Sequence, residues 1–208
     1  MIKGLDQDLL LAFNQNHTAF WDFFWLFFTD KLTGAIFTAI LILFCWKKSN
    51  FKTAFWIGTF LVASIVFTEL FSMLVKTSVA RPRPCSQYSV IANQIRLLAD
   101  GLFFKDDLID SNLVKCEKFS FFSAHAAVSF VIAGFIGRLL GRIHLIYFIS
   151  ICIWAFLVSA SRIYLGYHYP SDIIVGTLFG FGVGVIFYEI YQKLEQTTLK
   201  SYRFKVSK

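Results

Sequence analysis

Residues 161–172 read Ser-Arg-Ile-Tyr-Leu-Gly-Tyr-His-Tyr-Pro-Ser-Asp, and they stand where one long apolar run ends and the next begins. Arginine, histidine and aspartate are costly beside hydrocarbon, so a membrane chain seldom keeps them there without a function. Two more polar clusters stand at the ends of other apolar runs, namely Lys76 with Arg83-Pro84, and Ser123-Ala124-His125. This arrangement predicts that helix ends from distant parts of the chain meet at one membrane surface.

The composition is that of an integral membrane protein. Of the 208 residues, 57% are hydrophobic and 16% are charged, whereas a soluble domain is nearer to about a quarter charged. The net charge of +7 fits the usual excess of Lys and Arg on cytoplasmic loops. The basic residues are scattered among apolar runs and form no stripe, which argues against nucleic acid as a partner. The length suits a single membrane domain over residues 1–208.

The apolar runs predict an all-α, polytopic membrane helical bundle, because a segment in lipid must satisfy its own backbone hydrogen bonds. Four spans are clear, at residues 53–75, 122–140, 143–160 and 171–191. Residues 19–46 form a first span that Asp30-Lys31 interrupts. It is either one long broken helix or a half-membrane helix followed by a short span, so we expect five or six membrane helices. Residues 5–14 are amphipathic and predict an interfacial helix.

Basic residues set the orientation of these spans. Lysines lie between the first two spans, arginines lie between the third and fourth, and the tail over residues 193–208 is basic. This side should be cytoplasmic. The loop over residues 77–119 and all three polar clusters then face the exterior.

The external loop contains two features that the sequence leaves open. Cys85 and Cys116 both lie in it, and they can form a disulfide if the loop meets an oxidising compartment. Residues 91–104 mix apolar and charged side chains, as either an interfacial helix or a simple cover would.

The three polar clusters together carry the donors that a phosphoryl group needs. Arg83 and Arg162 offer guanidinium forks, and Lys76 adds a point charge. Ser123 offers a hydroxyl near the start of a helix, where free backbone N–H groups also favour an anion. This set predicts a phosphate-binding site.

The two histidines of the clusters suit different chemical roles. His168 lies four residues before Asp172, so the carboxylate can take one ring N–H and leave the other nitrogen as a nucleophile. His125 has no acidic neighbour within a helical turn and suits proton donation to a leaving oxygen. No carboxylate cluster accompanies them, so we expect metal-independent chemistry without a cofactor.

At these residues the chain resembles the type 2 phosphatidic acid phosphatase (PAP2) family, which shares its pocket with vanadium haloperoxidases. Lys76-x6-Arg83-Pro84 and Ser161-Arg162-x5-His168-x3-Asp172 match two of the family's three motifs. The remaining motif, Pro-Ser-Gly-His, is matched in part, because Phe122 and Ala124 replace its proline and glycine. The resemblance covers about residues 53–191.

The resemblance implies a role for each matched residue. His168 is the phosphorylated nucleophile, Asp172 orients it, and His125 is the general acid. The phosphate is held by Lys76, Arg83, Ser123, Arg162 and the backbone N–H of Ala124. The implied enzyme is a multi-pass lipid phosphate phosphatase of the bacterial inner membrane, with its active site facing the periplasm or exterior.

The substrate is not decided by these residues. For a bacterial member of this size the resemblance points first to undecaprenyl diphosphate, and phosphatidylglycerol phosphate, phosphatidic acid and a phosphate of lipid A are the other candidates. A transporter that binds an anionic lipid without hydrolysis is the alternative from another class, and a haloperoxidase is a third. The oligomeric state stays open.

Overall fold

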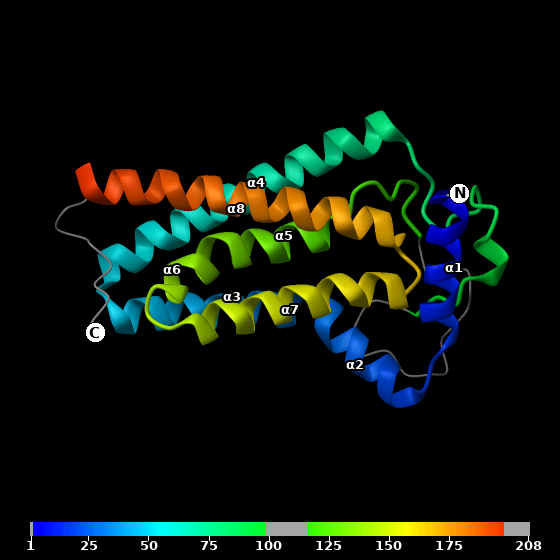
Figure 1. Ribbon diagram of the computed structural model, residues 1–208, viewed down its shortest axis with the longest axis horizontal. Coiled ribbons are helices and arrows are strands. Elements are labelled where there is room, and N and C mark those ends of the chain that lie inside the picture. The colour runs from blue at the N-terminus through cyan, green and yellow to red at the C-terminus, as the bar shows by residue number, and fades with distance from the viewer. Residues whose placement is uncertain (1, 99–115, 198–208) are drawn as a thin grey trace.

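The computed structural model describes residues 2–98 and 116–197, which form a bundle of long helices with one shorter helix lying across its end (Figure 1). The helices are α1 (Ile2–Gln15), α2 (Ala19–Thr29), α3 (Lys31–Lys48), α4 (Phe51–Val79), α5 (Ala124–Ile132), α6 (Arg138–Gly141), α7 (Leu145–Tyr164) and α8 (Pro170–Thr197). A π-helical segment, Ala133–Gly137, joins α5 to α6 without a break. The predicted all-α membrane fold is confirmed.

Four helical runs are long and apolar enough to cross a bilayer: α4, Ala124–Gly141, α7 and α8. They correspond to the four clear spans of the sequence. Helices α2 and α3 pass the same test only as a pair, with a bend of 55° between them. Asp30 causes the break, because its side chain accepts the N–H of Thr33 at 2.9 Å and starts α3 afresh. The predicted interruption is therefore present, and the described residues hold up to five spans.

Helix α5 packs directly on α8 through a stripe of glycines. Gly176, Gly180 and Gly184 recur every four residues, which places them on one face of α8. A Cβ added at these positions would lie 2.6, 2.0 and 2.5 Å from backbone oxygens of α5 or its N-cap. Small residues allow such close approach of helices in membranes. The start of α5 is thereby held beside the start of α8.

The two ends of the bundle differ in their side chains. The α3–α4 and α6–α7 turns lie at one end, and the α7–α8 turn and the start of α5 lie at the other (Figure 1). The first end carries basic residues such as Lys47 and Lys48. The second end receives all three polar clusters, as the counting of spans predicts.

Helix α1 crosses the second end of the bundle (Figure 1). The amide of Asn14 donates to the carbonyl oxygens of Arg96 at 2.9 Å and Tyr164 at 2.7 Å. These bonds attach α1 to the loop that follows α4 and to the end of α7. The predicted helix over residues 5–14 is thus present, and its place at the bilayer surface stays a prediction.

The predicted loop and tail lie partly outside the described residues. Within the loop, Ala92–Gln94 forms one 3₁₀ turn, so a helix over residues 91–104 does not form as far as residue 98. Helix α8 continues to Thr197, so the predicted tail over residues 193–208 begins as helix. Residues 99–115 and 198–208 are outside the description.

Candidate active site

The turn between α7 and α8 positions His168. The carbonyl oxygen of Arg162 accepts the N–H groups of Tyr167 at 3.1 Å and of His168 at 3.3 Å. Gly166 has φ of 73°, a left-handed conformation that glycine adopts at little cost at the end of a helix. The turn folds His168 back over the end of α7, where the side chain is 1% exposed.

His168 faces Asp172, as the spacing of four residues predicts. Their Nδ1 and Oδ2 atoms are 3.7 Å apart, which is longer than a hydrogen bond. Catalytic contacts are often long before substrate binds. Oδ2 of Asp172 also accepts the N–H of Tyr169 at 3.0 Å, a bond that caps the start of α8 in the manner of a capping box. Asp172 therefore has both the capping role and the position for orienting His168.

Burial lowers the pKa of His168 well below its ordinary value. The positive charges of Arg83, Arg162 and Lys76 lower this pKa further, and a hydrogen bond with the Ser120 backbone raises it in part. A neutral imidazole is the form that attacks phosphorus. The surroundings of His168 thus favour the neutral imidazole.

Three cations converge on His168 from different elements. Arg162 ends α7 and is 2% exposed, Arg83 lies in the loop after α4 and is 5% exposed, and Lys76 stands in the last turn of α4. The electrostatic influence of both arginines reaches Lys76. The Tyr167 ring lies 4.5 Å from the Arg162 guanidinium carbon and 5.9 Å from that of Arg83, which favours both cations. Positive charges held close together favour the binding of an anion between them.

The second polar cluster, Ser123 to His125, lies beside the two arginines among these cations. We call Lys76, Arg83 and Arg162, together with the imidazoles of His125 and His168, the cage. Ser123 caps α5, where its Oγ accepts the N–H of Ala126 at 3.4 Å and keeps its own proton to donate. Its N–H donates to the Asp172 carbonyl oxygen at 3.2 Å, which ties α5 to α8. Ala124 and His125 follow in the first turn, where backbone N–H groups have no acceptor within the helix. Arg162 and His168 both influence His125 electrostatically.

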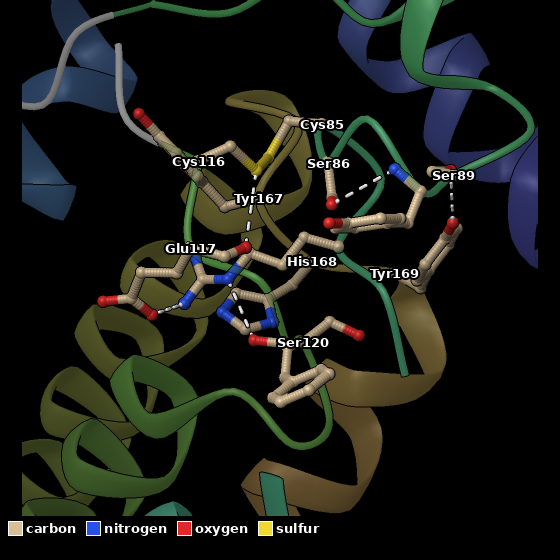
Figure 2. Close-up of a disulfide and its surroundings, with 12 residues drawn as sticks. Cys85, Ser86, Ser89, Cys116, Glu117, Ser120, Tyr167, His168 and Tyr169 are labelled. Carbon is tan, nitrogen blue, oxygen red and sulfur yellow. Dashed lines mark hydrogen bonds and ion pairs between the residues drawn. A yellow bond between two sulfur atoms is a disulfide. The ribbon is translucent and has the colours of Figure 1, made fainter. Parts of the chain in front are cut away.

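A disulfide clamps the loop that carries Arg83. Cys85 and Cys116 are bonded, and Figure 2 shows the bridge beside Tyr167, His168 and Glu117. The sequence left this pairing open. Arg83 is held further by its N–H, which donates to the Lys118 carbonyl oxygen at 3.2 Å, and by its Nε, which donates to that of Phe119 at 3.1 Å. The segment around residue 117 is therefore fixed against the segment around residue 83.

The structure adds functional candidates that sequence reasoning did not select. The Glu117 carboxylate, 71% exposed, pairs with the Arg83 guanidinium. Thr29, at the break between α2 and α3, accepts a hydrogen bond from Arg162. Lys31, in the same break, influences His125 electrostatically. Such contacts depend on segments far apart in the chain, and no local spacing signals them.

Ser161 and Arg81, which stand in or between the motif positions, make their hydrogen bonds outside the cage. Ser161 donates to the Val158 carbonyl oxygen at 2.7 Å within α7. Arg81, two residues before Arg83, donates to Asp172 at 2.8 Å and to Asp6 at 2.6 Å. Arg81 therefore supports a carboxylate rather than the phosphate position.

A cavity of about 680 Å³ leads away from His125 into the bundle. Its walls come from the end of α2 and from α3, α4, α5 and α7, and they are mostly apolar, with Lys31 and Glu69 among the exceptions. The apolar lining includes Ala35, Ile42, Ile65, Ile132 and Trp154. A mostly apolar cavity between the membrane-spanning helices therefore adjoins the cage.

The model of the PAP2 superfamily matches residues 57–196. The chain belongs to this superfamily. The PAP2 protein is 31% identical over 194 residues to the lipid A 4′-phosphatase of Bacteroides thetaiotaomicron, covering 93% of this chain and 80% of the relative. It is 26% identical to the lipid A 4′-phosphatase of Porphyromonas gingivalis, covering 91% of this chain and 74% of the relative.

Solved structures of the same superfamily share the fold. The PAP2 protein aligns with LpxE of Aquifex aeolicus at a TM-score of 0.65 and 25% identity, over 89% of this chain and 95% of that chain. It aligns with a transmembrane PAP2-type phosphatidylglycerolphosphate phosphatase of Bacillus subtilis at a TM-score of 0.63 and 19% identity, over 98% of this chain and 89% of that chain. The PAP2 protein is therefore a multi-pass membrane enzyme, a lipid phosphatase, and a transporter without hydrolysis is set aside.

Proposed function

We propose that this PAP2 enzyme removes the 4′-phosphate of lipid A at the periplasmic face of a bacterial inner membrane. The observation that carries the proposal is the cage of Lys76, Arg83 and Arg162 around two imidazoles, with an apolar cavity beside it. The 4′ position is favoured because the two relatives named for it match 93% and 91% of this chain. Relatives from Rhizobium named lipid A 1-phosphatases match 60% and 78%.

The first half of the reaction transfers the phosphoryl group to the protein. A nitrogen of His168 attacks phosphorus, and the bond between phosphorus and the sugar oxygen breaks. His125 gives a proton to that oxygen, so the dephosphorylated lipid leaves as an alcohol. Lys76, Arg83 and Arg162, with the Ser123 hydroxyl and the Ala124 N–H, stabilise the charge on the phosphoryl oxygens.

The second half regenerates the enzyme. His125, now neutral, takes a proton from water, and the water oxygen attacks phosphorus as the bond to His168 breaks. Inorganic phosphate forms and leaves, and both histidines return to their starting states. Asp172 holds the His168 ring throughout. No metal ion is needed in either half.

The surroundings of the cage suit a lipid. The cavity beside His125, at about 680 Å³, lies within the usual range for ligand sites of about 300–1,000 Å³. Its apolar walls along α3 and α7 suit acyl chains while the phosphate rests in the cage. Lys31 and Glu69 line the same cavity and are placed to meet polar groups near the sugar.

The orientation of the protein in the membrane is inferred from two features. The disulfide near the cage favours an oxidising compartment. The basic turn at Lys47 and Lys48 lies at the opposite end of the bundle, where cytoplasmic loops carry their positive charge. The cage therefore faces the periplasm.

The test is a phosphate-release assay with purified protein in the presence of EDTA. The panel contains lipid A with both phosphates, lipid A with either phosphate alone, undecaprenyl diphosphate, phosphatidylglycerol phosphate and phosphatidic acid. We expect release from the two lipid A forms that carry the 4′-phosphate, with mass spectrometry identifying the site. If another lipid of the panel is hydrolysed fastest, that lipid replaces lipid A as the proposed substrate. If phosphate release requires an added divalent ion, the metal-independent mechanism is wrong.

The mechanism has its own control. His168→Ala should abolish release and abolish covalent phosphate on the protein in a rapid-quench experiment. His17→Ala removes an exposed histidine outside the cage and should retain full activity. Turnover by His168→Ala would show that another group is the nucleophile.

A further inference from the structure

Asp172 is held by more than its own helix. Its Oδ1 accepts a hydrogen bond from Nη1 of Arg81 at 2.8 Å, and its side chain is 0% exposed. The Arg81 guanidinium also lies 3.9 Å above the centre of the Tyr169 ring. Arg81 thus contacts both the carboxylate that faces His168 and the residue that follows His168.

Arg81 is held in turn by helix α1. Its Nη2 donates to Oδ2 of Asp6 at 2.6 Å, and Asp6 is 6% exposed. Asp6 also accepts hydrogen bonds from Ser171, through Oδ1 from its N–H at 2.9 Å and through Oδ2 from its hydroxyl at 2.5 Å. Ser171 precedes Asp172 in α8, so Asp6 braces the start of that helix as well.

The contacts form one continuous chain from α1 to the nucleophile. It runs from Asp6 through Arg81 and Asp172 to His168, and each member is at least three-quarters buried, since the most exposed side chain, that of Arg81, is 25% exposed. Charge-assisted hydrogen bonds to a guanidinium fork are strong and directional. Such outer contacts commonly fix the orientation of a reactive group that they do not touch.

We propose that Asp6 and Arg81 are positioning residues for the phosphatase reaction, and that α1 belongs to the catalytic apparatus rather than serving only as an anchor at the membrane. Asp6 holds Arg81, Arg81 holds Asp172, and Asp172 sets the direction of the His168 ring. This inference rests on the proposed role of His168 as nucleophile.

The test separates positioning from simple attachment of α1. Asp6→Asn keeps the size of the side chain and removes the charge that holds Arg81. Asn14→Ala loosens α1 elsewhere, because Asn14 bonds Arg96 and Tyr164 and not Arg81. Both variants are compared with wild type in phosphate release and in thermal unfolding.

We expect Asp6→Asn to lower kcat about tenfold, the size typical of lost outer contacts, with KM within about twofold because the phosphate cage is untouched. Asn14→Ala should keep kcat within about twofold. In an Arg81→Gln background, Asp6→Asn should cause a clearly smaller loss than in the wild-type background, because most of its effect passes through Arg81 and only the remainder through Ser171. An equal loss of kcat in the Asn14 and Asp6 variants, a change in KM instead of kcat, or additive losses with Arg81→Gln would each overturn the proposal.

The outcome for His168→Ala distinguishes the two levels of the inference. If His168→Ala is active, the proposed nucleophile is wrong and the chain of contacts has no catalytic target. If His168→Ala is inactive while Asp6→Asn behaves as wild type, the mechanism stands and the positioning role fails.

Discussion

The contact between α5 and α8 gives a quantitative prediction for Gly180→Ala. A Cβ at Gly180 would lie 2.0 Å from the Ala127 carbonyl oxygen, whereas contacts below 3.0 Å are essentially absent from real structures. The shortfall is about 1 Å, and it cannot be relieved by a side-chain rotation because the neighbour is backbone. Overpacking of this kind costs about 1–3 kcal/mol, and we expect the upper end. The gain from alanine's better helix propensity is at most about 1 kcal/mol, so the net effect is destabilising.

The displacement should also reduce catalysis. Helix α5 carries His125 and α8 carries Asp172, so separating the helices moves the proposed proton donor away from the carboxylate that faces His168. A misplacement of about 1 Å can cost up to about 100-fold in rate. We therefore expect Gly180→Ala to lower both the unfolding temperature in detergent and kcat.

Gly182→Ala is the matched control, because a Cβ at Gly182 has nothing within 4 Å. It makes the same chemical change on the same helix and should be as stable and as active as wild type. Thermal unfolding and phosphate release are measured on both variants. If Gly180→Ala matches Gly182→Ala in stability and rate, α5 and α8 are not in backbone contact and the reasoning is wrong.

Three further predictions concern the cage and its clamp. Replacing Cys85 and Cys116 by serine opens a loop with a sequence separation of 31, and chain entropy predicts an unfolding free energy roughly 3–4 kcal/mol lower. The KM for the lipid should rise, because the segment that carries Arg83 is no longer held by the disulfide. An unchanged KM would contradict this reasoning. Glu117→Gln removes the carboxylate that competes for Arg83 and should tighten competitive inhibition by vanadate about threefold, a modest effect because the pair is exposed; weaker inhibition would show that Glu117 supports Arg83 instead. Because burial and nearby cations lower the pKa of His168, the ring stays neutral as pH falls through about 6.5, so the acid limb of kcat/KM should lie below that pH, and a limb centred at or above it would count against the assignment.

The sequence predicts the helices well because lipid allows few alternatives for an apolar run. The predicted span at residues 143–160 and the helix Leu145–Tyr164 differ by a few residues at each end. The interruption at Asp30 was also predictable, since an aspartate and a lysine end an apolar run and aspartate is a good helix cap. Counting these runs was enough to bring Lys76, His125 and His168 to one end of the bundle.

The supporting contacts were not predictable in the same way. Asp6 and Arg81 are separated by 75 residues, and the amphipathic pattern over residues 5–14 does not indicate that Asp6 contacts Arg81. Glu117 lies one residue from a cysteine whose pairing the sequence left open. The partners of these side chains depend on how α1 and the loop that follows α4 pack, and hydropathy does not specify that packing.

The double duty of Asp172 has a practical consequence for anyone who wishes to trap a substrate on this enzyme. Asp172→Ala, an obvious choice for an inactive variant, would fray the start of α8 at the same time, because Oδ2 of Asp172 also holds the N–H of Tyr169. Its failure to retain lipid would then be uninterpretable. A substitution at His168 leaves that cap in place. It is therefore the better inactive variant for trapping a bound lipid for crystallography or mass spectrometry.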